Sequence, residues 1–215
     1  MKNINFRFSA EGILKISAPC EISYKAMLSA IKKNENAVYR LYTAVKTKKH
    51  FSLKDDDFQS GSEIFLWGEK VEICFSKEAA FSHLDKNILY IKEDNLSDVE
   101  KKKKALNDFL HQTVKSFLLD FSKEIYSLYF KERVGEPSYS FKSLKSRWGS
   151  CCKAKNLITY NQNLIFLPRE FAEYIMVHEF CHLIVFDHSK AFYDEVKKIM
   201  PDYKRISDIQ KEYTF

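Results

Sequence analysis

Hydrophobic and polar residues alternate over the first twenty positions of the chain, and the spacing then becomes helical. The stretches "INFRF" and "GILKISA" show the two-residue period of half-buried strands, with a turn expected near Glu11 and Gly12. Ser23 is expected to cap a helix, because apolar residues recur three and four positions apart in "YKAMLSAIKK". A second helical stretch continues through Val38 and Leu41. The pattern therefore predicts a strand pair followed by two helices.

Strand patterns return in the next part of the chain and then give way to one long helix. After an expected loop over "KDDDFQSGS", the segment "EIFLWGEKVEICF" predicts a hairpin that turns at Gly68 and Glu69, and "NILYIKE" predicts another strand. From Val99 to Glu132 the spacing is helical, which predicts the longest helix of the protein. Its apolar stripe is expected to face the core: Leu106, Phe109, Leu110, Val114, Phe117, Phe121, Ile125 and Leu128.

The last third of the chain combines both kinds of pattern. The segments "SYSFKSLKSRWGSC" and "NLITYNQNLIFLP" predict strands joined by a turn at "KAKN". Pro168 is expected to open a helix, Ser189 to cap a final helix over "KAFYDEVKKIM", and Pro201 to end it. A chain of 215 residues is long enough for one large domain, or for a catalytic domain with a smaller N-terminal lobe.

Composition supports a folded protein and leaves the binding partners open. Hydrophobic residues make up 45% of the chain and glycine occurs only five times, which argues against a disordered or fibrous protein. The formal net charge is +6, and the one dense basic run is Lys101–Lys104. We interpret this run as the solvated start of a helix; the alternative is a surface that attracts nucleic acid or nucleotides. The sequence does not indicate nucleic-acid binding strongly.

The cysteines and the lack of long apolar runs predict a cytoplasmic protein. The five cysteines are an odd number without the spacing of a disulfide framework: Cys20, Cys74, Cys151, Cys152 and Cys181. The start of the chain lacks the apolar region of a signal peptide, and no apolar run approaches the length of about 18 residues that a membrane span needs. We therefore expect a reducing compartment and no contact with a membrane.

Three of the six histidines lie in one stretch of eleven residues, "HEFCHLIVFDH". Residues four apart on an α-helix are separated by about 40° around its axis, so His178 and His182 point to the same side. Their ring nitrogens can then meet one metal ion at about 2.0–2.1 Å. Glu179 lies one position further round, where it can take a proton from a metal-held water molecule. This is the general-base role in the H-E-x-x-H arrangement.

A catalytic zinc site usually has three protein ligands, and His188 is the candidate for the third. It follows His182 by six residues, which is the metzincin spacing, although metzincins have glycine where this chain has Val185. If the helix ended near Val185 or Phe186, a turn built without positive φ would have to bring His188 back over the site. Cys181 points away from the two helical histidines and is expected to be a small buried residue rather than a ligand.

Four ordered blocks in the C-terminal part carry a family resemblance. They are "SRWGSC", "ITYNQNLIFLP", "YIMVHEFCHLIVFDHS" with the "FY" that follows it, and "MPDYK", and they extend over about residues 140–204. In this order they resemble the YgjP-like metallopeptidase domain family of zincins. The resemblance implies an α+β, zincin-like catalytic domain over residues 99–215, with the active-site helix and a small sheet. A β-rich N-terminal lobe with short helices, residues 1–98, would precede it, unless the two form one continuous domain.

The resemblance also implies the chemistry of the site. It implies one zinc ion per chain, held by His178, His182 and His188, with Glu179 as the catalytic residue. The chain departs from the family pattern at four other positions: Glu173, Phe180, Asp187 and Tyr193. None of these departures removes a ligand or the base, so they bear on substrate preference rather than on metal binding.

Other residues of these blocks have two readings each. Arg147 could bind a substrate carboxylate or phosphate, or form a buried structural ion pair. Tyr203 could donate a hydrogen bond to a developing oxyanion, or simply pack below the last helix. Trp148 is expected in the core rather than as a substrate platform. The stretch "NLITYNQNLIF" is our candidate for an edge strand that pairs with an extended peptide.

These features favour a zinc-dependent hydrolase, most simply a cytoplasmic metallopeptidase with a peptide or protein substrate. The alternative enzyme is a metal-dependent nucleotide pyrophosphohydrolase acting on UTP-type substrates, an activity also attached to YgjP-like proteins. Its substrate phosphates would be neutralised by basic residues such as Lys145, Arg147 and Lys153. A non-enzymatic alternative is a protein- or DNA-associated binding module in which zinc only stabilises the fold; such a site would be closed by four protein ligands.

Overall fold

The computed structural model describes residues 4–8, 13–19, 21–46, 49–50, 53 and 58–214. Contacts within the chain group it into two compact units, Met1–His50 with Gln210–Phe215 and Phe51–Ile209. This grouping separates the chain near residue 50. The expected division after residue 98 stays a prediction. No helix among the described residues is long and apolar enough to cross a membrane.

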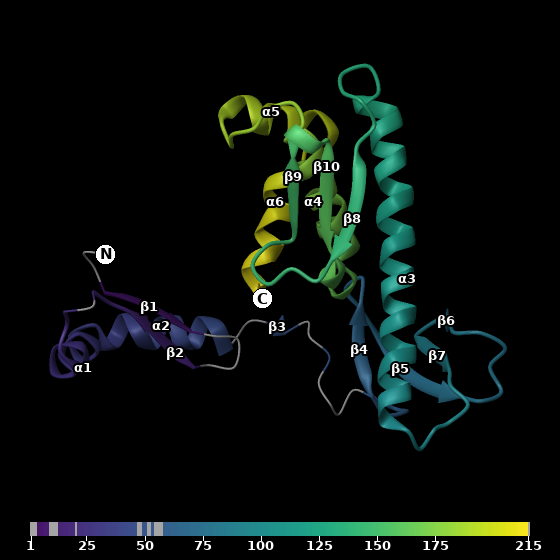
Figure 1. The fold of residues 1–215 in the computed structure, drawn as a ribbon, viewed down its shortest axis with the longest axis horizontal. Coiled ribbons are helices and arrows are strands. Elements are labelled where there is room, and N and C mark those ends of the chain that lie inside the picture. Colours follow the sequence, from purple (N-terminus) through teal and green to yellow (C-terminus); the bar gives the residue numbers. More distant parts are fainter. Residues whose placement is uncertain are drawn as a thin grey trace. The chain divides into compact units, whose positions relative to one another are not determined.

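The first unit contains the predicted strand pair and both predicted helices (Figure 1). Its elements are β1 (Asn5–Phe8), β2 (Leu14–Ser17), α1 (Tyr24–Lys33), α2 (Glu35–Lys46), β3 (Lys49–His50) and β11 (Tyr213–Thr214). Strands β1 and β2 are antiparallel, and β3 pairs in parallel with β11. Ser23 caps α1 as predicted, because its hydroxyl accepts a hydrogen bond from the backbone N–H of Ala26. The expected turn at Glu11 and Gly12 lies outside the described residues.

A four-stranded sheet begins the second unit. Its strands are β4 (Glu63–Leu66), β5 (Glu69–Ser76), β6 (His83–Asp85) and β7 (Ile88–Lys92), in the spatial order β4-β5-β7-β6. The predicted hairpin is confirmed, but its two-residue turn is Trp67–Gly68, one position earlier than expected. Leu66 pairs with Glu69, and both turn residues have positive φ, 52° and 86°. Part of the expected loop before this hairpin, residues 54–57, lies outside the described residues.

The long helix α3 spans Val99–Ile125 and continues as a π-helical turn over Tyr126–Phe130. Its buried residues lie three or four positions apart: Leu106, Leu110, Val114, Leu118, Ser122 and Ile125. The predicted core stripe was therefore wrong at its edges. Phe109, Phe117 and Phe121 are only half-buried, and Leu128 is exposed. The buried residues form a narrow stripe along the helix. The π-helical turn changes the direction in which the side chains beyond Ile125 point.

A three-stranded sheet forms the centre of the C-terminal part. Strand β10 (Leu157–Asn161) lies between β8 (Ser138–Lys142), to which it is parallel, and β9 (Gly149–Cys152), to which it is antiparallel. The prediction that "NLITYNQNLIF" forms an edge strand was wrong. Both sides of β10 are hydrogen-bonded to neighbours, and the chain turns into a 3₁₀-helix at Gln162–Phe166. The strands at the two edges of this sheet are β8 and β9.

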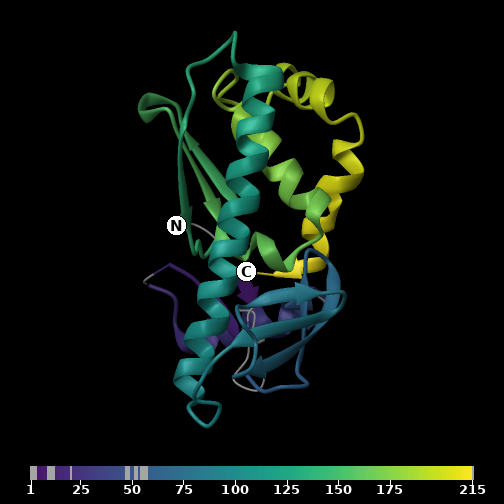
Figure 2. The ribbon, with the colours of Figure 1, turned by 90° about the vertical axis from the view of Figure 1, so that its right-hand side faces the viewer.

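Three helices complete the second unit: α4 (Arg169–Cys181), α5 (Lys190–Ile199) and α6 (Tyr203–Ser207). Helix α4 contacts β9 and β10 on one side and α5 and α6 on another (Figure 2). Pro168 precedes α4 and Ser189 precedes α5 as predicted, although the Ser189 side chain makes no capping hydrogen bond. Helices and small sheets confirm the α+β class, and a histidine-bearing helix lies against a small sheet as the zincin-like expectation requires. The sequence did not predict α6.

Candidate metal centre

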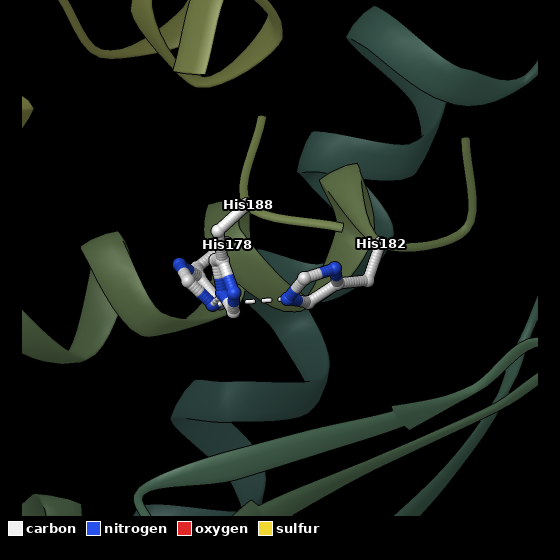
Figure 3. A group of neighbouring side chains, drawn as sticks. All are labelled: His178, His182 and His188. Atoms are coloured by element: carbon white, nitrogen blue, oxygen red, sulfur yellow. Dashed lines mark hydrogen bonds between the residues drawn. The ribbon is translucent and has the colours of Figure 1, made fainter. Parts of the chain in front are cut away.

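Helical register brings two of the predicted ligands together. His178 lies in the last turn of α4, and His182 directly follows the helix with φ −66° and ψ −19°, which are still helical values. The two side chains therefore keep the spacing of one helical turn. Their Nε2 atoms approach to 3.1 Å (Figure 3).

The third histidine reaches the cluster through a tight turn rather than through a glycine. The backbone N–H groups of Leu183, Ile184 and Val185 donate to carbonyls three or four residues back, at 2.9–3.0 Å. Val185 does not have a positive φ, so the turn is built without the left-handed conformation that a glycine would supply. The helix ends at Cys181, about one turn before the predicted end at Val185 or Phe186, and this leaves enough chain to return. His188 Nε2 then lies 3.1 Å from His178 Nε2.

The three imidazoles fit a metal ion. One nitrogen of each ring lies within 4.8 Å of the others, and no other group of three candidate ligands occurs in the described part of the chain. Tetrahedral coordination at 2.0–2.1 Å would separate two nitrogens by about 3.3 Å, close to the spacing seen here. His182 Nδ1 lies 3.2 Å from the carbonyl oxygen of Val185. A ring N–H donated to that carbonyl leaves the Nε2 lone pair available for a metal.

Burial favours the neutral form of His178 and His182, which is the form that binds metal. It lowers the pKa of His178 to about 3, with His182 and His188 adding to the effect. Burial also lowers the pKa of His182. The buried ring of Phe192, on α5, contacts all three imidazoles with centroid distances of 4.8, 4.4 and 4.9 Å. Phe192 therefore forms an apolar wall behind the cluster, a role that the sequence analysis did not assign.

Glu179 is buried on α4 beside the histidines. Burial raises the pKa of its carboxyl to about 8, and the positive charge of Arg147 opposes this rise. Gly149 of β9 faces the carboxyl so closely that an added Cβ would lie 2.7 Å from Glu179 Oε1. Gly149 was not among the predicted site residues, although a glycine inside a strand is a signal of close approach by another group.

A cavity of about 700 Å³ opens in front of these residues. Its walls include His178, Glu179, His182 and His188, together with Arg147, Gly149 and Cys151 from the β9 side and Phe186 and Asp187 from the loop. The Arg147 side chain is exposed and forms no ion pair with a described residue, so the reading as a buried structural pair was wrong. Its guanidinium remains available at the cavity wall.

The remaining candidate residues lie elsewhere. Tyr203 is buried and stacks on Tyr193 with ring centroids 5.5 Å apart, and it does not line the histidine cavity. Trp148 is buried against Phe171, as predicted. Cys181 is fully buried, and burial raises the pKa of its thiol to about 12. It is a free thiol, as are the other described cysteines.

Comparisons with known proteins relate the chain to one family and to parts of two solved structures. A family model described as "YgjP-like, metallopeptidase domain" matches residues 2–213. Two solved structures of metallopeptidase zymogens are similar to parts of the chain. Abylysin of Pyrococcus abyssi is 23% identical with a TM-score of 0.40, covering 46% of this chain and 99% of its own. Jannalysin of Methanocaldococcus jannaschii is 18% identical with a TM-score of 0.37, covering 42% and 89%. No curated protein matches the chain.

Proposed function

This chain belongs to the YgjP-like metallopeptidase family and is a metal-dependent peptidase, and we propose that it uses one zinc ion and a water molecule activated by Glu179. The observation that carries the proposal is the convergence of three imidazole nitrogens beside one buried carboxyl group. His178, His182 and His188 would hold the ion. Nitrogen donors in a set of three, with no sulfur or carboxylate among them, suit zinc in a catalytic site.

When bound, the zinc ion makes a water molecule more acidic and polarises the carbonyl group of the substrate. Glu179 takes the proton of the attacking water and later passes it to the departing amine. Without a metal, burial raises the pKa of this carboxyl to about 8; the positive charge of a bound ion would lower it again and favour the carboxylate form that acts as the base. Gly149 leaves the space that this carboxyl occupies.

Strand β9 would align the substrate. It lines the cavity through Gly149 and Cys151, and no strand of the described residues pairs with its outer side. An extended peptide can add to such an edge through backbone hydrogen bonds. Arg147, at the same wall, would bind a substrate carboxylate. An oxyanion role for Tyr203 stays a prediction that its packing on Tyr193 does not support.

The two alternative functions receive less support. Of the three basic residues expected to neutralise nucleotide phosphates, only Arg147 lines the cavity; Lys145 and Lys153 do not. A zinc site that only stabilises the fold would need a fourth protein ligand, and the cluster found in the described residues has three. A cytoplasmic location stays the expectation from cysteine content.

Substrate profiling tests the proposal. The full chain, freed of metal by chelation and reloaded with zinc, is assayed on a peptide library and on nucleoside triphosphates. We expect peptide cleavage that chelation abolishes and zinc restores, without release of pyrophosphate. Zinc-dependent hydrolysis of UTP with no peptide cleavage would establish the pyrophosphohydrolase instead.

A further inference from the structure

A second cavity, of about 730 Å³, lies between α5 and α6 and plays no part in the metal centre. One face of α5 lines it, because Lys190, Tyr193, Asp194 and Lys197 recur at the helical spacing of three and four. Helix α6 supplies Tyr203 and Lys204 from the other side. Both helices belong to the second unit, and they follow one another in the chain (Figure 2).

The charges in this cavity are predominantly positive. Lys190, Lys197 and Lys204 are exposed, and none of them forms an ion pair with a described residue; Asp194 is the one acidic group in the lining. The neighbouring Lys198 behaves differently, since its Nζ lies 2.7 Å from Glu195. Three ammonium groups around one concave surface raise the local concentration of anionic groups. The cavity thus favours a ligand with one or more negative charges.

The aromatic floor of the cavity argues against a nucleotide. Tyr193 and Tyr203 stack on each other with an interplanar angle of 17° and centroids 5.5 Å apart, so each ring covers one face of the other. Tyr203 is also only 9% exposed. Recognition of a nucleobase usually needs an open aromatic face. The carboxylate groups of an acidic peptide need only the ammonium donors that the cavity presents.

The cavity begins close to the metal centre. Lys190 is two residues beyond His188, and the Tyr193 ring lies 6.3 Å from the His188 ring. The two cavities share no lining residue, and an extended peptide, which advances about 3.3 Å per residue, would need a few residues to pass from the histidines to Lys190.

We propose that the cavity between α5 and α6 is a substrate subsite that binds acidic side chains of the peptide. This inference rests on the proposed peptidase function and adds the substrate class: peptides with glutamate or aspartate a few residues from the cleaved bond. The site would raise affinity for such peptides without taking part in the chemistry.

Binding is measured separately from cleavage. Zinc-loaded full-length protein carrying Glu179→Gln is titrated with a fluorescent peptide rich in glutamate and with its glutamine twin, at low and high salt. We expect the glutamate peptide to bind at least about tenfold more tightly, with a preference that shrinks as salt rises. Adding Lys190→Gln, Lys197→Gln and Lys204→Gln should abolish the preference.

The matched control replaces three exposed α3 lysines outside the cavity, Lys104→Gln, Lys115→Gln and Lys123→Gln, which lowers the net charge equally. It should keep the preference. Equal binding of the two peptides, or an equal loss in both triple variants, would overturn the subsite even if peptides are cleaved. UTP and a DNA oligonucleotide are titrated alongside the peptides. If the cavity substitutions weaken the binding of either of these ligands but not of the glutamate peptide, the subsite is also overturned. If glutamate preference depends on the cavity lysines but wild-type protein cleaves no peptide, the subsite stands and the proposed function fails.

Discussion

Helix α4 and the loop that follows it, residues 183–189, both contribute to the histidine cluster, but by different means. Nine of the thirteen α4 residues are buried, and helical register alone places His178 and His182 side by side. His188 is exposed on the loop, and its position depends on the tight turn after Cys181 and on contact with Phe192. Local geometry thus determines the first two ligands, whereas the third depends on tertiary structure.

The largest effect should come from Glu179, whose carboxyl group lies on helix α4. Glu179→Gln keeps the shape of the side chain but removes the base, so we expect kcat to fall by about 10²–10⁴-fold while zinc content stays at one per chain. Peptidase assays at equal zinc content measure this. Glu173→Gln, which alters a surface pair with Arg169, is the matched control and should stay near wild-type activity. Residual Glu179→Gln activity within tenfold of wild type would refute the general-base role.

The loop ligand can be tested by its contribution to affinity. His188→Ala leaves a two-histidine site, so zinc affinity should fall by more than about 100-fold. This loss is larger than the loss of about 10- to 100-fold that follows when a residue that only orients a metal ligand is removed. Competition with a chromogenic chelator measures the affinity. His111→Ala, a histidine on α3 outside the cluster, should bind zinc normally. Unchanged affinity in His188→Ala would mean that another residue is the third ligand, and Asp187→Ala should then lose zinc instead.

The contact between β9 and α4 should have an intermediate effect. In Gly149→Ala the new methyl group would meet Glu179 Oε1 at 2.7 Å, so the carboxyl group or the strand must move. Displacements of about 1 Å can cost on the order of 100-fold in rate, and we expect a loss of that order with zinc retained. Kinetics together with zinc analysis separate this from unfolding, and Cys152→Ala, at an exposed position of the same strand outside the cavity lining, is the control. Wild-type kcat in Gly149→Ala would show that the close approach is unimportant.

The smallest effect should come from the buried cysteine inside the motif. From the helical geometry, Cys181 lies about 60° round the axis from His178 and about 100° from His182, on the side opposite Glu179, and its sulfur is not part of the converging histidine group. Cys181→Ala should keep zinc and activity, and lower the free energy of unfolding by about 1 kcal/mol through lost packing. Urea denaturation measures the stability, with the exposed Cys152→Ala as control. Zinc loss from a folded Cys181→Ala protein, judged by circular dichroism, would mean that the coordination shell is misassigned.

Features that depend on local spacing could be predicted from the sequence. The helical period located α3, and the i, i+4 relation brought His178 and His182 to one side of a helix. Alternation located the β1–β2 pair and the β4–β5 hairpin. These patterns are properties of neighbouring residues, so they are visible before the chain folds.

Features that depend on which elements meet could not be predicted. The pattern of β10 is the same for an edge strand and a central one, because the order of strands is set by pairing with β8 and β9. The contact between Gly149 and Glu179 joins residues thirty positions apart, and Phe192 reaches the histidines only because α5 packs on α4. Leu128 carries an apolar pattern but lies on the π-turn, where the helical register is lost.

Anomalous scattering at the zinc absorption edge, from crystals of the zinc-loaded protein, tests the central claim most directly. We expect one peak per chain, at about 2.0–2.1 Å from a ring nitrogen of each of His178, His182 and His188, with a water molecule in the fourth position beside Glu179. A peak away from these histidines, or a fourth protein ligand closing the site, would contradict a catalytic zinc centre.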